Sequence, residues 1–214
     1  MQSVYKTISI MRKVFSLLLI VLMASPVLAQ YNTGGYSFES DKLYYGIRIG
    51  MNSSSIGSDN ELLDASSSRV GMSLGGVIGL RLSESHPTFL ESGLYYIQKG
   101  GKGKGYKVEL NYLEVPVLIK YGFQASGSDL AFLPFVGPYF SYAIGGKYKA
   151  GGTKHSIFKS GFYNHADVGF KLGCGFEYHM LYGEIGYQFG VTDISDIDDP
   201  AHIRGLFLHF GVNF

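Results

Sequence analysis

The chain has 214 residues, a formal net charge of +1, 46% hydrophobic residues and only 16% charged residues. Low charge without a basic excess excludes a disordered chain and an electrostatic nucleic-acid partner. One cysteine, Cys174, excludes a disulfide-stapled scaffold and a multi-cysteine metal site. The 30 glycines, 17 tyrosines and 15 phenylalanines favour a glycine- and aromatic-rich β-protein.

The N-terminal segment has the pattern of a secretory signal peptide. A pair of basic residues precedes an apolar stretch over 14–23, and small residues ending at Ala29 form a cleavage signal. We expect residues 1–29 to be removed on export, with Met11 as an alternative start. The apolar stretch is too short to span a bilayer as a helix. Residues 30–42 are then expected to form a short periplasmic tail.

Eight segments of the remaining chain alternate apolar and polar residues with period two, which predicts a β-strand in each. The segments are 43–52, 70–82, 88–98, 108–123, 131–147, 163–178, 181–192 and 204–214. After the signal peptide there is no run of about 18 apolar residues, so no transmembrane helix is expected. The exported chain is therefore either a soluble β-protein or one that crosses a membrane as strands.

Glycine placement indicates which face of these strands is crowded. Only Gly76 and Gly183 fall on the apolar face, whereas sixteen glycines fall on the polar face, at positions 46, 50, 71, 75, 79, 93, 122, 137, 145, 169, 173, 175, 186, 190, 205 and 211. A polar face in water has no need of small residues, but the lumen of an eight-stranded barrel is only wide enough for its own side chains. The sequence therefore predicts an all-β fold, an eight-stranded antiparallel transmembrane β-barrel over 43–214. The expected topology is an up-and-down meander with a closed, packed lumen and its apolar face toward lipid.

The polar face also carries charges of both signs. The predicted lumen network consists of Arg48, Arg81, Glu91, Glu114, Lys120, Asp167, Lys171, Glu177 and Glu184. Four cations and five anions suit a closed set of ion pairs, because an unpaired buried charge is costly. A tight turn after Arg81 would make it a diagonal neighbour of Glu91. The alternative is nine separately solvated charges.

The connections alternate in length, which favours an outer-membrane barrel with long external loops and short periplasmic turns. The long connections are 53–69, 99–107, 148–162 and 193–203, and the short ones are 83–87, 124–130 and 179–180. Aromatic residues are expected at the two membrane interfaces. The inner rim would hold Tyr45, Tyr121, Phe123, Phe132, Phe176, Tyr178 and Phe214, and the outer rim Tyr96, Phe140 and Tyr142.

The segment 112–121, YLEVPVLIKY, resembles a motif of the small outer-membrane β-barrel domain family often labelled PorT-like. The segments 94–100 (LYYIQKG) and 190–195 (GVTDIS) are similar to two further motifs of that family. The terminal Phe214 resembles the C-terminal aromatic residue that the outer-membrane assembly machinery recognises. The resemblance covers roughly residues 40–214. It implies a fold and a location but no reaction, although PorT itself is associated with a protein-secretion system of gliding bacteria.

Two loops and one proline invite a local interpretation. Four carboxylates in 193–200, followed by His202, offer oxygens to a divalent cation, but the spacing is not that of an EF-hand, so a solvated acidic loop is favoured. The lysine- and glycine-rich segment 99–107 lacks a Gly-Lys-Ser/Thr motif and is predicted to be a flexible hairpin tip. Contact with anionic headgroups is its alternative. Pro116 predicts a bulge or bend in the fourth strand.

Acid–base catalysis has little support in the sequence. His155, His165 with Asp167, and His179 lack a serine in a recognisable motif beside them. Cys174 falls on the apolar face, where it is interpreted as a small hydrophobic residue. We therefore predict no enzymatic activity, no cofactor and no metal site.

The resulting hypothesis is an integral protein of the bacterial outer membrane with a structural, adhesive or surface-interaction role. Its expected partners are outer-membrane lipids and lipopolysaccharide, the outer-membrane assembly machinery and an envelope protein, with no nucleic acid. The alternatives are an accessory subunit of an outer-membrane secretion or assembly system, and a narrow pore. A general porin channel is excluded because it needs about sixteen strands.

Overall fold

The computed structural model describes residues 43–58, 65–83, 85–103, 105–124, 129–150, 153–156, 164–194 and 201–214. The predicted signal peptide (1–29) and periplasmic tail (30–42) lie outside the described residues. Within the described ranges, no helix has the length and apolar character needed to cross a membrane.

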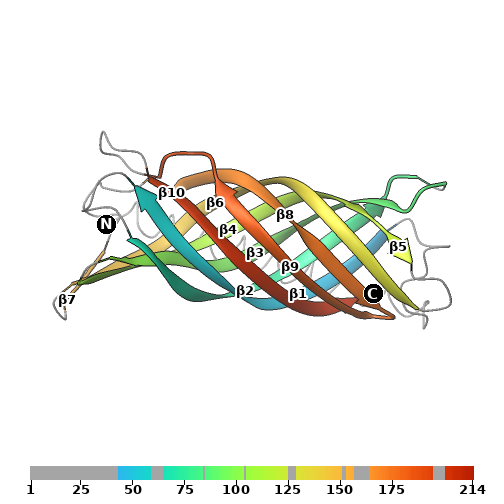
Figure 1. Cartoon of the computed structure of the whole chain (residues 1–214), viewed down its shortest axis with the longest axis horizontal. Helices are drawn as coiled ribbons and strands as arrows, with labels where there is room; N and C mark the ends of the chain where they lie inside the picture. Colours follow the sequence, from blue (N-terminus) through green and yellow to red (C-terminus); the bar gives the residue numbers. More distant parts are fainter. Residues whose placement is uncertain are drawn as a thin grey trace, which may run out of the picture.

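Eight long strands form one closed antiparallel barrel (Figure 1). They are β1 (Leu43–Ser58), β2 (Ala65–Arg81), β3 (Thr88–Gly103), β4 (Tyr106–Tyr121), β6 (Leu130–Ala150), β8 (Ala166–Tyr178), β9 (Leu181–Gly190) and β10 (Ala201–Asn213). Each long strand pairs with the next one along the chain, and the pairing of β1 with β10 closes the barrel. The predicted up-and-down topology is confirmed.

Two short strands extend β6 at opposite ends of the barrel. β5 (Phe123–Gln124) pairs with the start of β6, and β7 (Thr153–Ser156) pairs with its end. The end of the barrel that holds β5 and the C-terminus is called the short-turn end below, and the end that holds β7 is called the loop end (Figure 1).

All eight predicted strands are present, and the differences lie mostly at the loop end. β1 continues to Ser58 and β2 begins at Ala65, where the sequence predicted a loop over 53–69. The segment 99–107, predicted to be a flexible tip, forms a paired hairpin whose strands reach Gly103 and resume at Tyr106. The hairpin is confirmed, but both connections were predicted too long, because serine, glycine and lysine weaken the apolar alternation while the backbone ladder continues.

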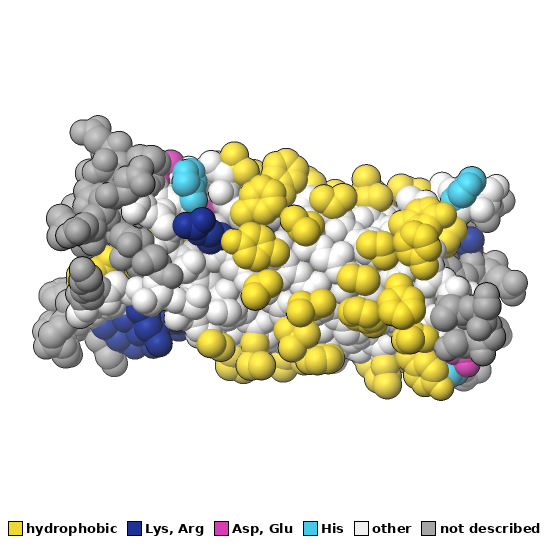
Figure 2. Space-filling view, in the orientation of Figure 1, with side chains coloured by type: hydrophobic (Ala, Val, Ile, Leu, Met, Phe, Trp, Pro, Cys, Tyr) yellow, Lys and Arg dark blue, Asp and Glu magenta, His cyan; other side chains and the backbone are white. Residues whose placement is uncertain are grey.

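The two faces of the strands are arranged as predicted. In β4, the inward Glu114 and Lys120 are fully buried, whereas the outward Val115 and Ile119 are 38% and 52% exposed. Figure 2 shows the outward apolar side chains as a broad belt across the visible face of the barrel, with Lys and Arg side chains gathered nearer the loop end. An apolar belt of this extent is favourable in hydrocarbon and not in water, so it is the face toward lipid.

Six glycines on the lumen face lie directly opposite aromatic rings of the neighbouring strand. The directly opposite couples are Tyr44–Gly79, Tyr95–Gly75, Phe135–Gly173, Tyr139–Gly169, Phe207–Gly186 and His209–Gly50. In each couple the ring occupies the space that a Cβ atom on the glycine would need. On the lipid face, a Cβ atom at Gly76 would meet nothing nearer than 3.9 Å. The glycine face is therefore the crowded one, and rings cover the gaps that glycine leaves.

The bulge predicted at Pro116 is not found there. Pairing with β6 runs without a shift from Tyr112 to Lys120, and the irregularity lies earlier, between Asn111 and Tyr112. A proline removes one ladder donor but requires no inserted residue, so it fits an unshifted strand. Its carbonyl oxygen accepts a hydrogen bond from the hydroxyl of Ser92 at 2.8 Å, which satisfies a polar group of the lipid face.

Aromatic side chains lie on the outer surface at both predicted rims. At the short-turn end, the rings of Phe132 and Phe176 are 5.5 Å apart and their side chains are exposed. The side chain of Phe214 is also exposed, and its backbone exchanges two hydrogen bonds with Tyr45 of β1. On the loop side, Tyr142 is 50% exposed. These positions suit aromatic belts at membrane interfaces.

Candidate functional site

The middle of the lumen holds a set of charged side chains that are at most 4% exposed. They come from β1, β3, β4, β8, β9 and β10, and they are Arg48, Glu91, Lys99, Glu114, Lys120, Asp167, Lys171, Glu177 and Glu184 together with His209. We call this set the lumen network. Because strands across the barrel supply it, only the closed fold brings it together.

The part of the lumen network nearer the short-turn end centres on Lys120. Its ammonium nitrogen lies 2.7 Å from a Glu91 oxygen and 3.5 Å from a Glu184 oxygen. Lys120 also donates to the hydroxyl of Tyr182, which in turn donates to Glu184. The guanidinium of Arg48 lies 3.7 Å from Glu91 and stacks 3.9 Å above the Tyr182 ring. Two cations and two anions therefore compensate one another around one aromatic ring.

The part nearer the loop end centres on Lys99 and Glu114. The Lys99 ammonium lies 2.7 Å from Glu114 and 3.1 Å from Asp167. Lys171 forms a further ion pair with Glu114, so this carboxylate lies between two ammonium groups. The Ser141 hydroxyl donates to Glu114 at 2.8 Å. Four charges from β3, β4 and β8 thus neutralise one another away from water.

Histidine and asparagine side chains connect to these groups. His209 Nδ1 lies 2.8 Å from Glu184, and the imidazole stacks between the rings of Tyr95 and Phe207. Toward the short-turn end, Asn213 accepts a hydrogen bond from Arg48 and donates one to Glu177. The network therefore extends along the lumen rather than forming one compact cluster.

The structure places the predicted residues differently in two respects. Arg81 and Glu91 are diagonal neighbours across β2 and β3, as predicted. The Glu91 carboxylate nevertheless pairs with Arg48 and Lys120. Arg81 Nε instead donates to the Ser83 carbonyl at 2.9 Å. Lys99 was predicted in a loop but is fully buried in the network. The sequence could have predicted this position, because Lys99 lies an even number of residues beyond Glu91 and therefore shares its face of the strand.

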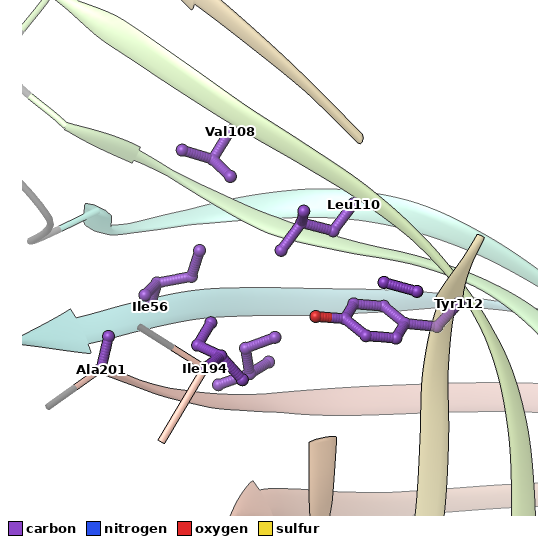
Figure 3. Packing of buried hydrophobic residues seen from close by; sticks show 8 residues of the cluster. Ile56, Val108, Leu110, Tyr112, Ile194 and Ala201 are labelled. Atoms are coloured by element: carbon purple, nitrogen blue, oxygen red, sulfur yellow. The ribbon is translucent and has the colours of Figure 1, made fainter. Parts of the chain in front are cut away.

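An apolar cluster closes the lumen on the loop side of the network. It is formed by Ile56, Val108, Leu110, Tyr112, Ala143, Ile194, Ala201 and Ile203, all at most 2% exposed, and we call it the outer cap. Figure 3 shows side chains of β1, β4 and β10 converging in this cluster. A second cluster, which includes Tyr44, Phe89 and Leu133, packs toward the short-turn end. The network is thus enclosed between two apolar layers.

The motif at 112–121 supplies the lumen directly. Its alternate residues Tyr112, Glu114, Leu118 and Lys120 are all buried inside the barrel. The similar segment 94–100 contributes Lys99. The family motifs therefore encode the packing and charge of the lumen.

The other candidate groups do not form a reactive cluster. The acidic loop lies largely outside the described residues, and Asp193 accepts a hydrogen bond from the Ala201 amide at 2.8 Å. His165 stacks on Tyr142, and the imidazole of His179 lies 3.5 Å from Asp129 at the short-turn end. The side chain of His155 is outside the described part. Within the described residues, no three His, Cys, Asp or Glu side chains are placed to hold a metal ion.

A closed barrel with an apolar outer belt, interfacial aromatic residues and a charged, packed lumen defines an integral β-barrel membrane protein. The family model described as "Outer membrane protein beta-barrel domain" matches residues 26–196, and the chain belongs to that family. The protein is therefore an integral protein of the bacterial outer membrane.

Solved structures of small outer-membrane barrels are similar to this chain. Neisserial surface protein A is 15% identical, with a TM-score of 0.51 over 79% of this chain and 97% of that chain. Ail of Yersinia pestis is 12% identical, with a TM-score of 0.43 over 81% of this chain and 100% of that chain. OprG of Pseudomonas aeruginosa is 14% identical, with a TM-score of 0.44 over 84% of this chain and 99% of that chain. The likeness to the neisserial protein shows the fold alone. A search of curated proteins found no match.

Proposed function

We propose that this protein is a sealed barrel that works through its outer surface and not through its lumen, in a structural, adhesive or surface-interaction role. The observation that carries the proposal is the filling of the lumen. Lys99 is fully buried between Glu114 and Asp167, and the outer cap places the fully buried Ile56 and Ile203 beyond it.

This filling argues against the narrow pore. A conducted ion needs a continuous polar path that replaces its hydration shell. Here an ion entering from the loop end first meets the apolar outer cap and then buried charges that are already paired with opposite charges. Separating a buried pair to admit another ion leaves an uncompensated charge, which costs about 3–5 kcal/mol.

The strands support a role at the surface because they continue past the apolar belt. β3 and β4 run to a hairpin at Gly103 and Tyr106, and β6 continues to Ala150 and pairs with β7. Pairing holds the backbone of these extensions in a defined arrangement above the membrane. A partner would therefore meet preorganised strands, which lowers the entropy cost of binding.

Neither catalysis nor secretion enters the proposal. Asp167 is held by Lys99 and by the Tyr139 hydroxyl, so it is not poised as a base for a substrate. The motif at 112–121, which carries the PorT-like resemblance, is accounted for by lumen packing. An accessory role in secretion would show itself as a stable complex with secretion components after detergent extraction.

Planar-bilayer recording tests the sealed barrel. The purified protein should insert without discrete conductance steps, while a general porin under the same conditions gives them. The protein is delivered to the bilayer from lipid vesicles, and its folded state in those vesicles is verified by heat-modifiable migration on a gel. Regular conductance steps at neutral pH would overturn the proposal in favour of a pore.

A further inference from the structure

A row of lysines crosses the loop-end part of three neighbouring strands. Register sets Lys102 of β3 opposite Lys107 of β4, and Lys107 opposite Lys149 of β6. Residues directly opposite in an antiparallel sheet share a face. The adjacent Val108 is buried in the outer cap, so the row lies on the outer face of the barrel. Lys107 and Lys149 remain 38% and 34% exposed.

One carboxylate is shared within this row. Glu109 lies 3.0 Å from Lys149, 3.3 Å from Lys107 and 3.5 Å from Arg69. Burial alone would raise the pKa of Glu109, but hydrogen bonds from Lys149 and Lys107 lower it below its ordinary value, so the group is ionised at neutral pH. Three cations against one anion leave an excess of two positive charges.

Two further lysines enlarge the excess. Lys102 is exposed at the edge of the row, and Lys147, opposite Glu109, is exposed beside it. Like charges placed directly opposite each other destabilise a sheet. The arrangement therefore works against the stability of the isolated hairpins, and an external anion would relieve the repulsion.

The row lies just beyond the outer limit of the apolar belt. The last outward apolar residues toward the loop end are Leu113 in β4 and Ile144 in β6. Lys147 lies three residues beyond Ile144, whereas Lys149 and Lys107 lie five and six residues beyond Ile144 and Leu113, which is roughly 8–15 Å along the membrane normal for tilted strands. The headgroup region extends roughly 5–8 Å beyond the hydrocarbon, and lysine side chains reach back toward it.

We propose that Lys102, Lys107, Lys147 and Lys149 form a binding surface for the phosphate groups of the anionic glycolipid in the outer leaflet. Glu109 fixes the positions of two of these ammonium groups, so that their spacing is set before binding. The inference goes beyond the proposed function, because a sealed barrel needs no such surface.

The test measures binding of the folded barrel in detergent to a bisphosphorylated lipid A and to the same lipid without phosphates. Each lysine near an anionic surface contributes about fivefold to affinity. The quadruple variant Lys102→Gln, Lys107→Gln, Lys147→Gln, Lys149→Gln should lose at least about 100-fold. Arg204→Gln, which removes an exposed cation from β10, should bind as the wild type does. Wild-type protein should bind the phosphate-free lipid as weakly as the quadruple variant binds the bisphosphorylated lipid A.

Unfolding separates binding from structure. Without glycolipid, the quadruple variant should still fold, with a urea midpoint close to that of the wild type, because losing two partly exposed ion pairs to Glu109 is offset by removing the repulsion between opposite lysines. Equal binding of the two lipids by the wild type, or unchanged lipid A affinity in the quadruple variant, would overturn the proposal.

Discussion

Tyr139 and Gly169 face each other across β6 and β8, and the tyrosine ring lies where a Cβ atom on Gly169 would have to be. The hydroxyl of the same tyrosine donates to Asp167 at 3.1 Å. The glycine therefore lets an aromatic ring lie against the barrel wall while its hydroxyl reaches the lumen network. Glycine content and buried charge are thus two aspects of one packing arrangement.

Gly169→Ala should destabilise the barrel by about 1–3 kcal/mol through overpacking. The added Cβ atom would lie 2.8 Å from both the Tyr139 ring and the Cα atom of Gly190, so the ring or the backbone must shift. Gly76→Ala on the lipid face is the matched control. Urea midpoints of the refolded variants compare the two, and equal midpoints would contradict crowding of the glycine face.

Lys99→Met should cost about 3–5 kcal/mol, because Glu114 and Asp167 lose a shared buried cation. Lys102→Met, three residues further along β3 and exposed, should stay within about 0.5 kcal/mol of the wild type. Adding Asp167→Asn to Lys99→Met should recover part of the loss. If the two lysine variants unfold at the same urea concentration, Lys99 is not a member of the network.

Much of this architecture was predictable from the sequence, because period-two alternation and glycine placement depend only on local geometry. The partners of each charge were not predictable. Glu91 meets Lys120 only because β3 and β4 pair in one particular register, and it meets Arg48 only after the barrel closes. The outer cap was also missed, since Ile56 and Ile194 fell in segments expected to be loops.

Leu172→Arg should destabilise the barrel by about 2–4 kcal/mol, because the outward side chain near the middle of β8 faces hydrocarbon. Tyr178→Arg, at the end of the same strand, should cost only about 0–1 kcal/mol near the interface. The measurement is the free energy of unfolding in lipid vesicles. Similar costs at the two positions would contradict a lipid-facing belt.

Glu109 should contribute stability that depends on pH. Its pKa in the folded barrel is lowered, so the contribution is present above the unfolded carboxyl pKa of 4.5 and is lost as the pH falls through the folded value. The advantage of the wild type over Glu109→Gln should therefore shrink progressively below pH 4.5. Urea midpoints at stepped pH measure the difference, and a constant difference down to strongly acidic pH would argue against these ion pairs.

The most direct test of a sealed lumen inside a lipid-facing wall is thiol labelling of the folded barrel in vesicles, in a Cys174→Ser background. Ser141→Cys, fully buried in the lumen, should resist a charged water-soluble reagent until the barrel is unfolded. Val136→Cys, which is 55% exposed on the outer face in wild type, should react only with a membrane-soluble reagent. Rapid labelling of Ser141→Cys by the water-soluble reagent in the folded barrel would contradict the account.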